Sequence, residues 1–210
     1  MSGPGARLTR ADLGGDPLTV ARSLLGAHLE AGPVTLRLTE VEAYWGPADP
    51  GSHGYRGITP RTEVMFGPPG HLYVYRSYGI HWCCNVVCGA TGECAAVLLR
   101  AGEVVDWDEV VRQRRPSVPA RDLARGPGRL TKALGIGGQD NGAALVGRGA
   151  PFVLRAPRAP VAEERIRTGP RVGVSGPGGD GAAYPWRFWL DAEPSVSVYR
   201  PGKQRTPRGT

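Results

Sequence analysis

The chain has 210 residues, of which 40% are hydrophobic, and its formal net charge at pH 7 is +7. A chain of this size and composition can bury one sizeable core, so we expect one domain rather than two. No segment resembles a signal peptide and no apolar run is long enough to span a bilayer, which argues against a membrane-spanning protein and predicts an intracellular one, in the reducing cytoplasm or nucleoid.

The positive charge is unevenly distributed along the chain. Residues 1–100 are balanced in charge, and the whole excess lies in residues 101–210. Only Lys132 and Lys203 are lysines, so the positive surface consists almost entirely of guanidinium groups, which suit bidentate phosphate contacts. The excess charge indicates a polyanionic partner, whereas a genome that favours arginine codons would produce the arginine bias without any functional meaning.

The N-terminal part of the chain predicts one helix and two strands. Residues 1–6 are rich in Gly and Pro and are expected to be flexible. Asp16 followed by Pro17 predicts an N-cap and a first helical position, and apolar residues at helical spacing continue to a stop at Gly26. Residues 27–30 and 34–44 then read as two strands joined by a short turn.

Glu42, at the end of the second of these strands, is the residue around which the chain is organised. Residues 34–38 alternate apolar and polar side chains, which is typical of a half-buried strand. If this register continues, Glu42 and Tyr44 lie on the same face as Leu36 and Leu38, where an unpaired acid would be costly. The alternative is a bulge after Leu38 that turns Glu42 outward and gives the core face to its two neighbours. The strand pattern alone leaves both readings open.

A long loop and an antiparallel meander follow. Residues 45–70 are rich in Gly and Pro and carry His53, Tyr55, Arg56 and Arg61; long loops of this kind are functional or disordered. Residues 71–76, 81–88 and 94–100 predict three consecutive antiparallel strands. The turn between the first two contains Tyr78, where turn chemistry favours Asn, Asp or Gly. Tyr78 either folds back onto its own hairpin or protrudes as a wedge.

The four cysteines lie within this meander. Adjacent residues of a strand face opposite sides, so Cys83 and Cys84 do not readily bind one metal ion, and no C-x-x-C pair is present. Together with Cys88 and Cys94 they are therefore interpreted as reduced, small, buried apolar side chains.

The second half of the chain predicts two helices and several short strands. Asp106 and Glu109 have the spacing of a capping box, opening a helix that ends in a basic segment before Pro116. A second helix begins at Gly126-Pro127. Its start, preceded by Arg125 and followed by Arg129 and Lys132, fits either a phosphate-binding site or an ordinary solvated face. Short strands are predicted at residues 152–155, 171–174, 187–190 and 195–198, and residues 201–210 are expected to be a flexible basic tail after a single domain spanning residues 7–200.

A series of ordered motifs resembles the alkyladenine (3-methyladenine) DNA glycosylases, the mammalian-type family that is distinct from the helix-hairpin-helix glycosylases. The motifs cover nearly the whole folded chain and are Glu42-Ala43-Tyr44, Gly46-Pro47, His53, Thr59-Pro60-Arg61, Met65-Phe66, Gly70-His71-Leu72-Tyr73-Val74-Tyr75, Tyr78-Gly79, Asn85, Leu98-Leu99-Arg100-Ala101, Gly126-Pro127 with Leu130, Arg171-Val172-Gly173-Val174, Arg187-Phe188 and Val196-Ser197-Val198.

The resemblance implies a fold and a set of site residues. The fold is a single α/β domain of the α+β type, with a central, curved, mostly antiparallel sheet, peripheral helices and a protruding hairpin that inserts into DNA. Glu42 matches the general base, which takes a proton from the attacking water, and Arg100 matches the arginine beside that water. The residues that match the pocket for an extruded base are Tyr44, His53, Tyr75, Asn85 and Leu98, and Asn85 is the one expected to exclude guanine. Tyr78 matches the side chain that intercalates into DNA, and further DNA contacts are expected from Tyr73, Ile80, Arg125, Arg129 and Lys132.

The resemblance also implies the reaction. The expected substrate is double-stranded DNA with an alkylated or deaminated purine, such as 3-methyladenine, hypoxanthine or ethenoadenine, and the expected enzyme is a monomer with no metal or other cofactor. A glycosylase that is also a lyase needs an amine near the sugar, and because Lys132 lies outside the matched pocket we expect a monofunctional enzyme. Two alternatives are a non-catalytic minor-groove DNA-binding protein, which would not need Glu42 together with Arg100, and a metal-dependent nuclease, for which no ligand cluster is visible.

Overall fold

The structure is a computed structural model that describes residues 3–106 and 108–202. Within these residues nine strands form one sheet in which all the pairings are antiparallel. The strands are β1 (Pro4–Arg7), β2 (His28–Ala31), β3 (Val34–Tyr44), β4 (Leu72–Ser77), β5 (His81–Val87), β6 (Ala96–Asp106), β7 (Phe152–Pro157), β8 (Ile166–Gly169) and β9 (Arg187–Leu190). The helices are α1 (Pro17–Ser23), α2 (Asp108–Arg114) and α3 (Pro127–Leu134), supplemented by short 3-10 turns.

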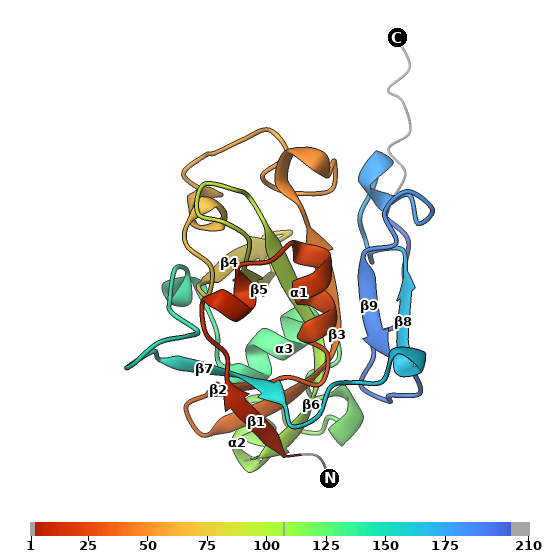
Figure 1. Cartoon of the computed structure of the whole chain (residues 1–210). Helices are drawn as coiled ribbons and strands as arrows, with labels where there is room; N and C mark the ends of the chain where they lie inside the picture. The colour runs from red at the N-terminus through yellow and green to blue at the C-terminus, as the bar shows by residue number, and fades with distance from the viewer. Residues whose placement is uncertain (1–2, 107, 203–210) are drawn as a thin grey trace.

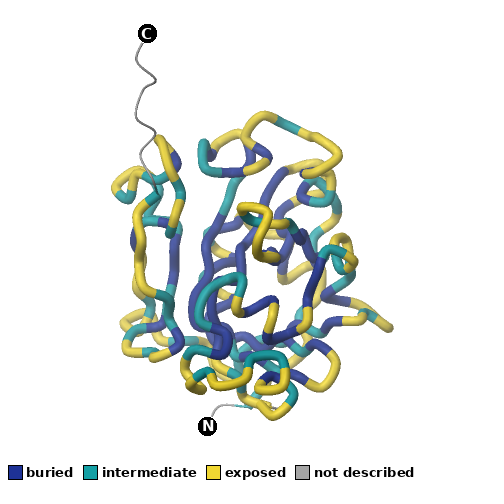
Figure 2. Tube along the Cα trace, turned by 180° about the vertical axis from the view of Figure 1, so that it is seen from behind, coloured by how far each residue is buried: buried dark blue, intermediate teal, exposed yellow. Residues whose placement is uncertain are grey.

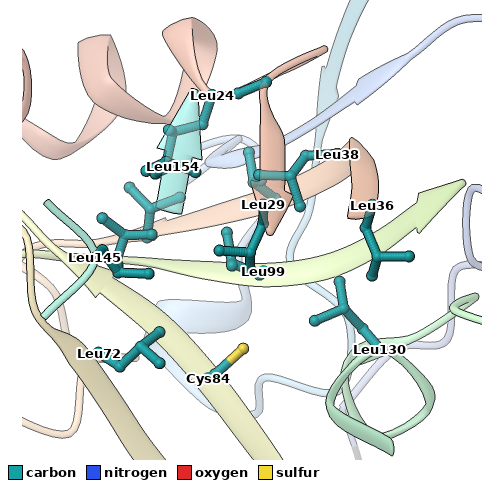
Figure 3. Close-up of a cluster of buried hydrophobic side chains, with 14 of the residues drawn as sticks. Leu24, Leu29, Leu36, Leu38, Leu72, Cys84, Leu99, Leu130, Leu145 and Leu154 are labelled. Atoms are coloured by element: carbon teal, nitrogen blue, oxygen red, sulfur yellow. The ribbon is translucent and has the colours of Figure 1, made fainter. Parts of the chain in front are cut away.

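The sheet runs in the order β1-β7-β2-β3-β6-β5-β4, and β9 pairs with β3 and with β8. Figure 1 shows the β8–β9 ribbon standing beside β3 at one side of the molecule. α1 packs on β3, and α3 packs on β5 and β6. Leucines from these elements meet in one core, which includes Leu24 after α1, Leu36 and Leu38 of β3, Leu99 of β6 and Leu130 of α3 (Figure 3). The predicted α+β fold with a large antiparallel sheet is confirmed.

The register of β3 resolves the alternatives at Glu42. The pairing of β3 with β6 shifts between Leu38 and Glu40 and again between Glu40 and Val41. After this bulge Val41 and Ala43 join the core that contains Leu36 and Leu38, as the second reading predicts, so Glu42 does not share the face of those leucines. Glu42 is nevertheless 0% exposed, because its own face is covered as well.

The cover over Glu42 comes from a change of partner along one edge of β3. β2 pairs with residues 34–37 of β3, whereas β9 pairs with residues 40–42. Glu42 therefore lies between Leu98 of β6 and Arg187 of β9. A strand that is paired on both edges and covered on both faces can bury its alternate residues in two separate clusters.

Several local expectations differ from the structure. Pro4–Arg7, part of which was expected to be flexible, forms β1 and pairs with β7. Residues 171–174 and 195–198 are loops rather than strands, and β8 was not predicted. Asp106 ends β6 instead of capping the next helix, which begins at Asp108. Of the expected flexible tail, residues 203–210 lie outside the described residues.

The N-terminal ends of α1 and α3 follow their sequence signals. The Asp16 side chain accepts hydrogen bonds from Leu18 N and Thr19 N, both at 3.0 Å. Gly126 caps α3, whose first residue is Pro127. Among the described residues no helix has the length and hydropathy needed to cross a membrane.

Candidate active site

The loops that follow β3 and β8 lie at the same end of the molecule (Figure 1), and a cavity of about 910 Å³ opens there. Figure 2 shows buried strands in the middle of the molecule and exposed loops around them. The cavity is lined by aromatic, basic and glycine-rich segments: Tyr44, residues 50–53, Arg61, Met65, Tyr73, residues 75–79, Cys83, Asn85, Leu98, Arg100, Pro127, residues 172–175 and Arg200.

Glu42 lies directly behind the wall of this cavity. Its Oε1 accepts a hydrogen bond from Val172 N at 2.7 Å, and its Oε2 accepts from the Tyr44 hydroxyl at 2.8 Å and from Arg100 Nη1 at 3.2 Å. All three donor residues line the cavity. Burial raises the pKa of the Tyr44 phenol, and the Glu42 charge raises it further, so Tyr44 keeps the proton that it donates to Glu42.

A second carboxylate, Glu40, holds Arg100 more closely than Glu42 does. Arg100 Nε donates to Glu40 Oε1 at 2.8 Å, and Arg187 Nε donates to the same oxygen at 2.8 Å. Ser197 N donates to the other oxygen of Glu40 at 2.6 Å. Two carboxylates and two guanidinium groups are thus buried together with no net charge.

The pKa values within this cluster follow from the pairing. Burial acts to raise the pKa of Glu40, but the charges of Arg100 and Arg187 outweigh it and lower that pKa. For Arg100, burial acts to lower the pKa, but Glu42 and Glu40 outweigh burial and raise it. Both groups therefore stay ionised in the folded protein.

Three aromatic rings form one wall of the cavity. The rings of Tyr73 and Tyr75 are stacked with centroids 5.5 Å apart, and the His53 ring meets Tyr75 edge-on at 4.5 Å. His53 Nδ1 lies 3.1 Å from the Tyr73 hydroxyl. The Arg61 guanidinium lies 5.6 Å from the centre of the Tyr75 ring and 3.5 Å from His53 Nε2.

His53 is neutral at physiological pH. Loss of solvation at the cavity wall lowers the pKa of its imidazole to about 4, with a further contribution from the Arg61 charge. A neutral imidazole beside two phenols presents a wall without positive charge of its own.

Asn85, Leu98 and Cys83 complete the inner part of the cavity. Asn85 Nδ2 donates to the Tyr73 carbonyl at 3.0 Å, and Asn85 pairs with Leu98 across β5 and β6. Cys83 lines the cavity while Cys84 lies in the core, as the alternation of strand side chains predicts. All four cysteines are free and buried.

The tip of the β4–β5 hairpin carries exposed apolar side chains at the mouth of the cavity. Tyr78 is 89% exposed and Ile80 is 68% exposed. Tyr78 has a φ of 49°, in the left-handed region that non-glycine residues rarely adopt. The Tyr78 side chain therefore protrudes instead of folding back onto its hairpin, and its role as a wedge stays a prediction.

The other predicted DNA contacts differ in position. Tyr73 is 1% exposed and belongs to the cavity wall, and its contact with DNA stays a prediction. Arg125 Nε donates to the Val196 carbonyl at 2.7 Å and its Nη1 contacts Asp122, whereas Arg129 and Lys132 are exposed on α3.

The structure brings four residues to this site that the sequence did not single out as site residues: Glu40, Arg187, Asp49 and Arg171. A signal existed for Glu40, which lies two residues before Glu42 and repeats its strand period. No local pattern links Arg187 to Glu40 or Arg171 to Asp49, because their partners are more than a hundred residues away in the chain.

Comparisons with known proteins identify similar sequences. A family model described as methylpurine-DNA glycosylase matches residues 11–194. A protein of Nocardia farcinica is 54% identical over 199 residues, covering 92% of this chain and 90% of the relative. Proteins of Frankia casuarinae and Streptomyces avermitilis are 51% and 50% identical, covering 89% and 95% of this chain and 90% and 96% of the relatives. All three carry the name "Putative 3-methyladenine DNA glycosylase".

Proposed function

The chain belongs to the methylpurine-DNA glycosylase family, and from that premise we propose that it extrudes alkylated or deaminated purines from duplex DNA and hydrolyses their N-glycosidic bonds with Glu42 as the general base. Family membership makes the protein a DNA-3-methyladenine glycosylase that acts in DNA repair. The proposal adds base flipping, a substrate range that includes hypoxanthine and ethenoadenine, and a role for each residue.

The observation that carries the proposal is the buried Glu42 carboxylate behind an aromatic cavity. A carboxylate accepts about four hydrogen bonds, and Val172, Tyr44 and Arg100 supply three. The remaining capacity suits the attacking water, which would lie between Glu42 and Arg100. Glu42 would take a proton from this water, and its charge would stabilise the positive charge that develops on the sugar as the bond breaks.

The aromatic wall supports a purine that has left the base stack. Stacking on aromatic side chains contributes about 1–3 kcal/mol per base, and an electron-poor, cationic purine gains further from the ring faces of Tyr44 and Tyr75. Asn85 and Leu98, which line the inner cavity, would contact the edge of the base and exclude a purine with a 2-amino group. The exposed Tyr78 would enter the space that the extruded base leaves in the duplex.

The test is release of free base from a duplex that carries one hypoxanthine or one 3-methyladenine, with a chelator present. We expect release by the wild-type protein. In Glu42→Gln, which removes the general base but keeps the shape of the side chain, we expect a rate lower by about 10²–10⁴-fold. Gel-shift measurement should show that Glu42→Gln still binds the duplex. Unchanged release in Glu42→Gln would refute its role as the base, and binding without any release would favour the non-catalytic alternative.

The proposed reaction is monofunctional. Lys132, on α3, does not line the cavity, and the attack is assigned to water rather than to an amine. Borohydride added during the reaction should therefore trap no covalent protein–DNA adduct. An adduct that disappears in Lys132→Ala would show that the protein is also a lyase.

A further inference from the structure

A fully buried guanidinium lies behind the ring of Tyr44. The Arg171 Cζ is 4.5 Å from the centre of the Tyr44 ring, and both Arg171 and Asp49 have side chains that are 0% exposed. Tyr44 lines the cavity and Arg171 does not. Arg171 therefore backs Tyr44 on the side away from the space that a base would occupy.

The charge of Arg171 is compensated by one carboxylate. Its Nη1 and Nη2 each donate to an oxygen of Asp49 at 2.6 Å, which makes the pair bidentate. The remaining hydrogen bonds of the guanidinium are to neutral carbonyls, Ala43 O at 3.0 Å and Gly178 O at 2.7 Å, and it also faces the rings of Tyr184 and Trp186. The environment behind Tyr44 thus contains a cation and an anion in contact, with no net charge.

The pair also fixes the position of the Tyr44 ring. Arg171 links its own loop to the end of β3 and to the loop that contains Asp49. The residue after it, Val172, donates a hydrogen bond to Glu42. The packing is close, because a Cβ on Gly51 would lie 2.5 Å from Arg171 Nη2. Tyr44, Asp49 and Val172 therefore cannot shift independently of Arg171.

The neutrality of this pair matters for a cationic base. A cation is attracted to the face of an aromatic ring, but an uncompensated cation on the opposite face would repel it. With the guanidinium 4.5 Å behind the ring and a stacked base roughly 3.5 Å in front of it, the two charges would be about 8 Å apart. At an effective dielectric constant of about 20, this repulsion weakens binding roughly thirtyfold without screening and roughly fourfold with full screening, and a partly buried pair of charges lies between these limits.

We propose that Arg171 and Asp49 are positioning residues that hold Tyr44 as a stacking surface and, by cancelling each other's charge, preserve its preference for positively charged purines over neutral ones. The inference rests on the proposed function, in which Tyr44 contacts the extruded base. It assigns to a pair outside the cavity a part of the substrate preference.

The experiment measures affinity in a Glu42→Gln background for three duplexes, carrying 3-methyladenine, hypoxanthine or no lesion. The first lesion is a cation and the second is neutral, and the undamaged duplex corrects for general DNA binding. Adding Asp49→Asn leaves the Arg171 charge uncompensated, so the affinity ratio of the cationic to the neutral lesion should fall roughly tenfold. Adding Asp49→Asn together with Arg171→Gln restores neutrality, and the ratio should return to within about threefold of the parent value.

The double variant separates charge from structure. If the pair had only a structural role, the double variant would lose as much affinity as the single variant or more, and the two lesion-containing duplexes would be affected alike. An unchanged ratio in a folded Asp49→Asn protein would overturn the proposal. If Asp49→Asn does not fold, Arg171→Gln leaves Asp49 behind Tyr44 without its counter-ion, and the ratio must rise; an unchanged or lower ratio would overturn the proposal as well.

Base release by the wild-type protein distinguishes the two levels of the inference. If the wild type releases no damaged base, the proposed function fails and this inference fails with it. If it releases base while the affinity ratios stay equal among the variants, only the role of Arg171 and Asp49 is refuted.

Discussion

The charge cluster behind the cavity wall, which consists of Glu40, Glu42, Arg100 and Arg187, is buried, whereas the tip of the β4–β5 hairpin exposes apolar surface. In this cluster Glu40 and Glu42 are 0% exposed, and their negative charges are compensated by Arg100 and Arg187. At the tip, Tyr78 is 89% exposed, so its substitution should change the free energy of unfolding of the free protein only slightly. Buried charge is tolerated only where every partner is present. A substitution in the charge cluster should therefore affect both folding and catalysis, whereas a substitution at the tip should affect DNA binding alone.

The largest expected effect is a loss of stability when the buried charge cluster is disrupted. Glu40→Ala leaves Arg100 and Arg187 without the carboxylate that they share, and we expect a loss of roughly 3–5 kcal/mol in the free energy of unfolding. Denaturant titration followed by circular dichroism measures it. Glu103→Ala is the matched control, because Glu103 is half-exposed in its ion pair with Arg37 and should cost less than about 1 kcal/mol. Equal losses would refute the distinction.

The next effect concerns the tip and should change DNA binding alone. Tyr78→Ala removes the side chain proposed to fill the gap in the duplex, and loss of its stacking should weaken binding to a lesion-containing duplex by roughly 10- to 100-fold. The free energy of unfolding should change by less than about 0.5 kcal/mol relative to Tyr78→Phe, since the side chain is exposed. Tyr78→Trp should retain binding. A large loss of stability in Tyr78→Ala would show that the tip is part of the fold.

A smaller effect isolates the backbone of the tip. Tyr78 has a φ of 49°, and an L-residue in this region is strained by roughly 1–2 kcal/mol, which glycine avoids. Tyr78→Gly should therefore unfold with a free energy up to about 1 kcal/mol higher than Tyr78→Ala, while both bind DNA equally weakly. Thermal unfolding compares the two variants, and a less stable Tyr78→Gly would argue against strain at this turn.

The smallest effect is electrostatic and lies between the two regions. Arg61 contributes to lowering the pKa of His53, which is about 4, so Arg61→Gln should raise that pKa toward the ordinary value of 6.5. NMR titration of the His53 ring measures the change, and Arg61→Lys, which keeps the charge, should leave the pKa low. An unchanged pKa in Arg61→Gln would assign the whole shift to desolvation.

The same pKa gives the sign of a pH effect on stability. The folded pKa of His53 lies below its unfolded value, so the unfolded chain binds more protons between about pH 4 and pH 6.5. The contribution of His53 to stability is therefore present above pH 6.5 and is lost as the pH falls through this window.

The sequence by itself predicted the local elements that short-range signals encode. Asp16-Pro17 and Gly126-Pro127 marked helix starts correctly, because an N-cap is a matter of a few neighbouring residues. The alternation in residues 34–38 and the meander identified the central strands, and the adjacent Cys83 and Cys84 were correctly expected on opposite faces. The motif series also identified the family.

The tertiary structure decided what depends on contacts between distant segments. The strand pattern of β3 left the orientation of Glu42 open, and only the bulge at Glu40 together with the pairing of β9 showed that its face is buried. The carboxylates that Arg100, Arg187 and Arg171 contact lie 58 to 147 residues away in the chain. A sequence pattern reports the periodicity of its own segment, whereas a buried charge is stabilised by whichever segment the fold brings against it.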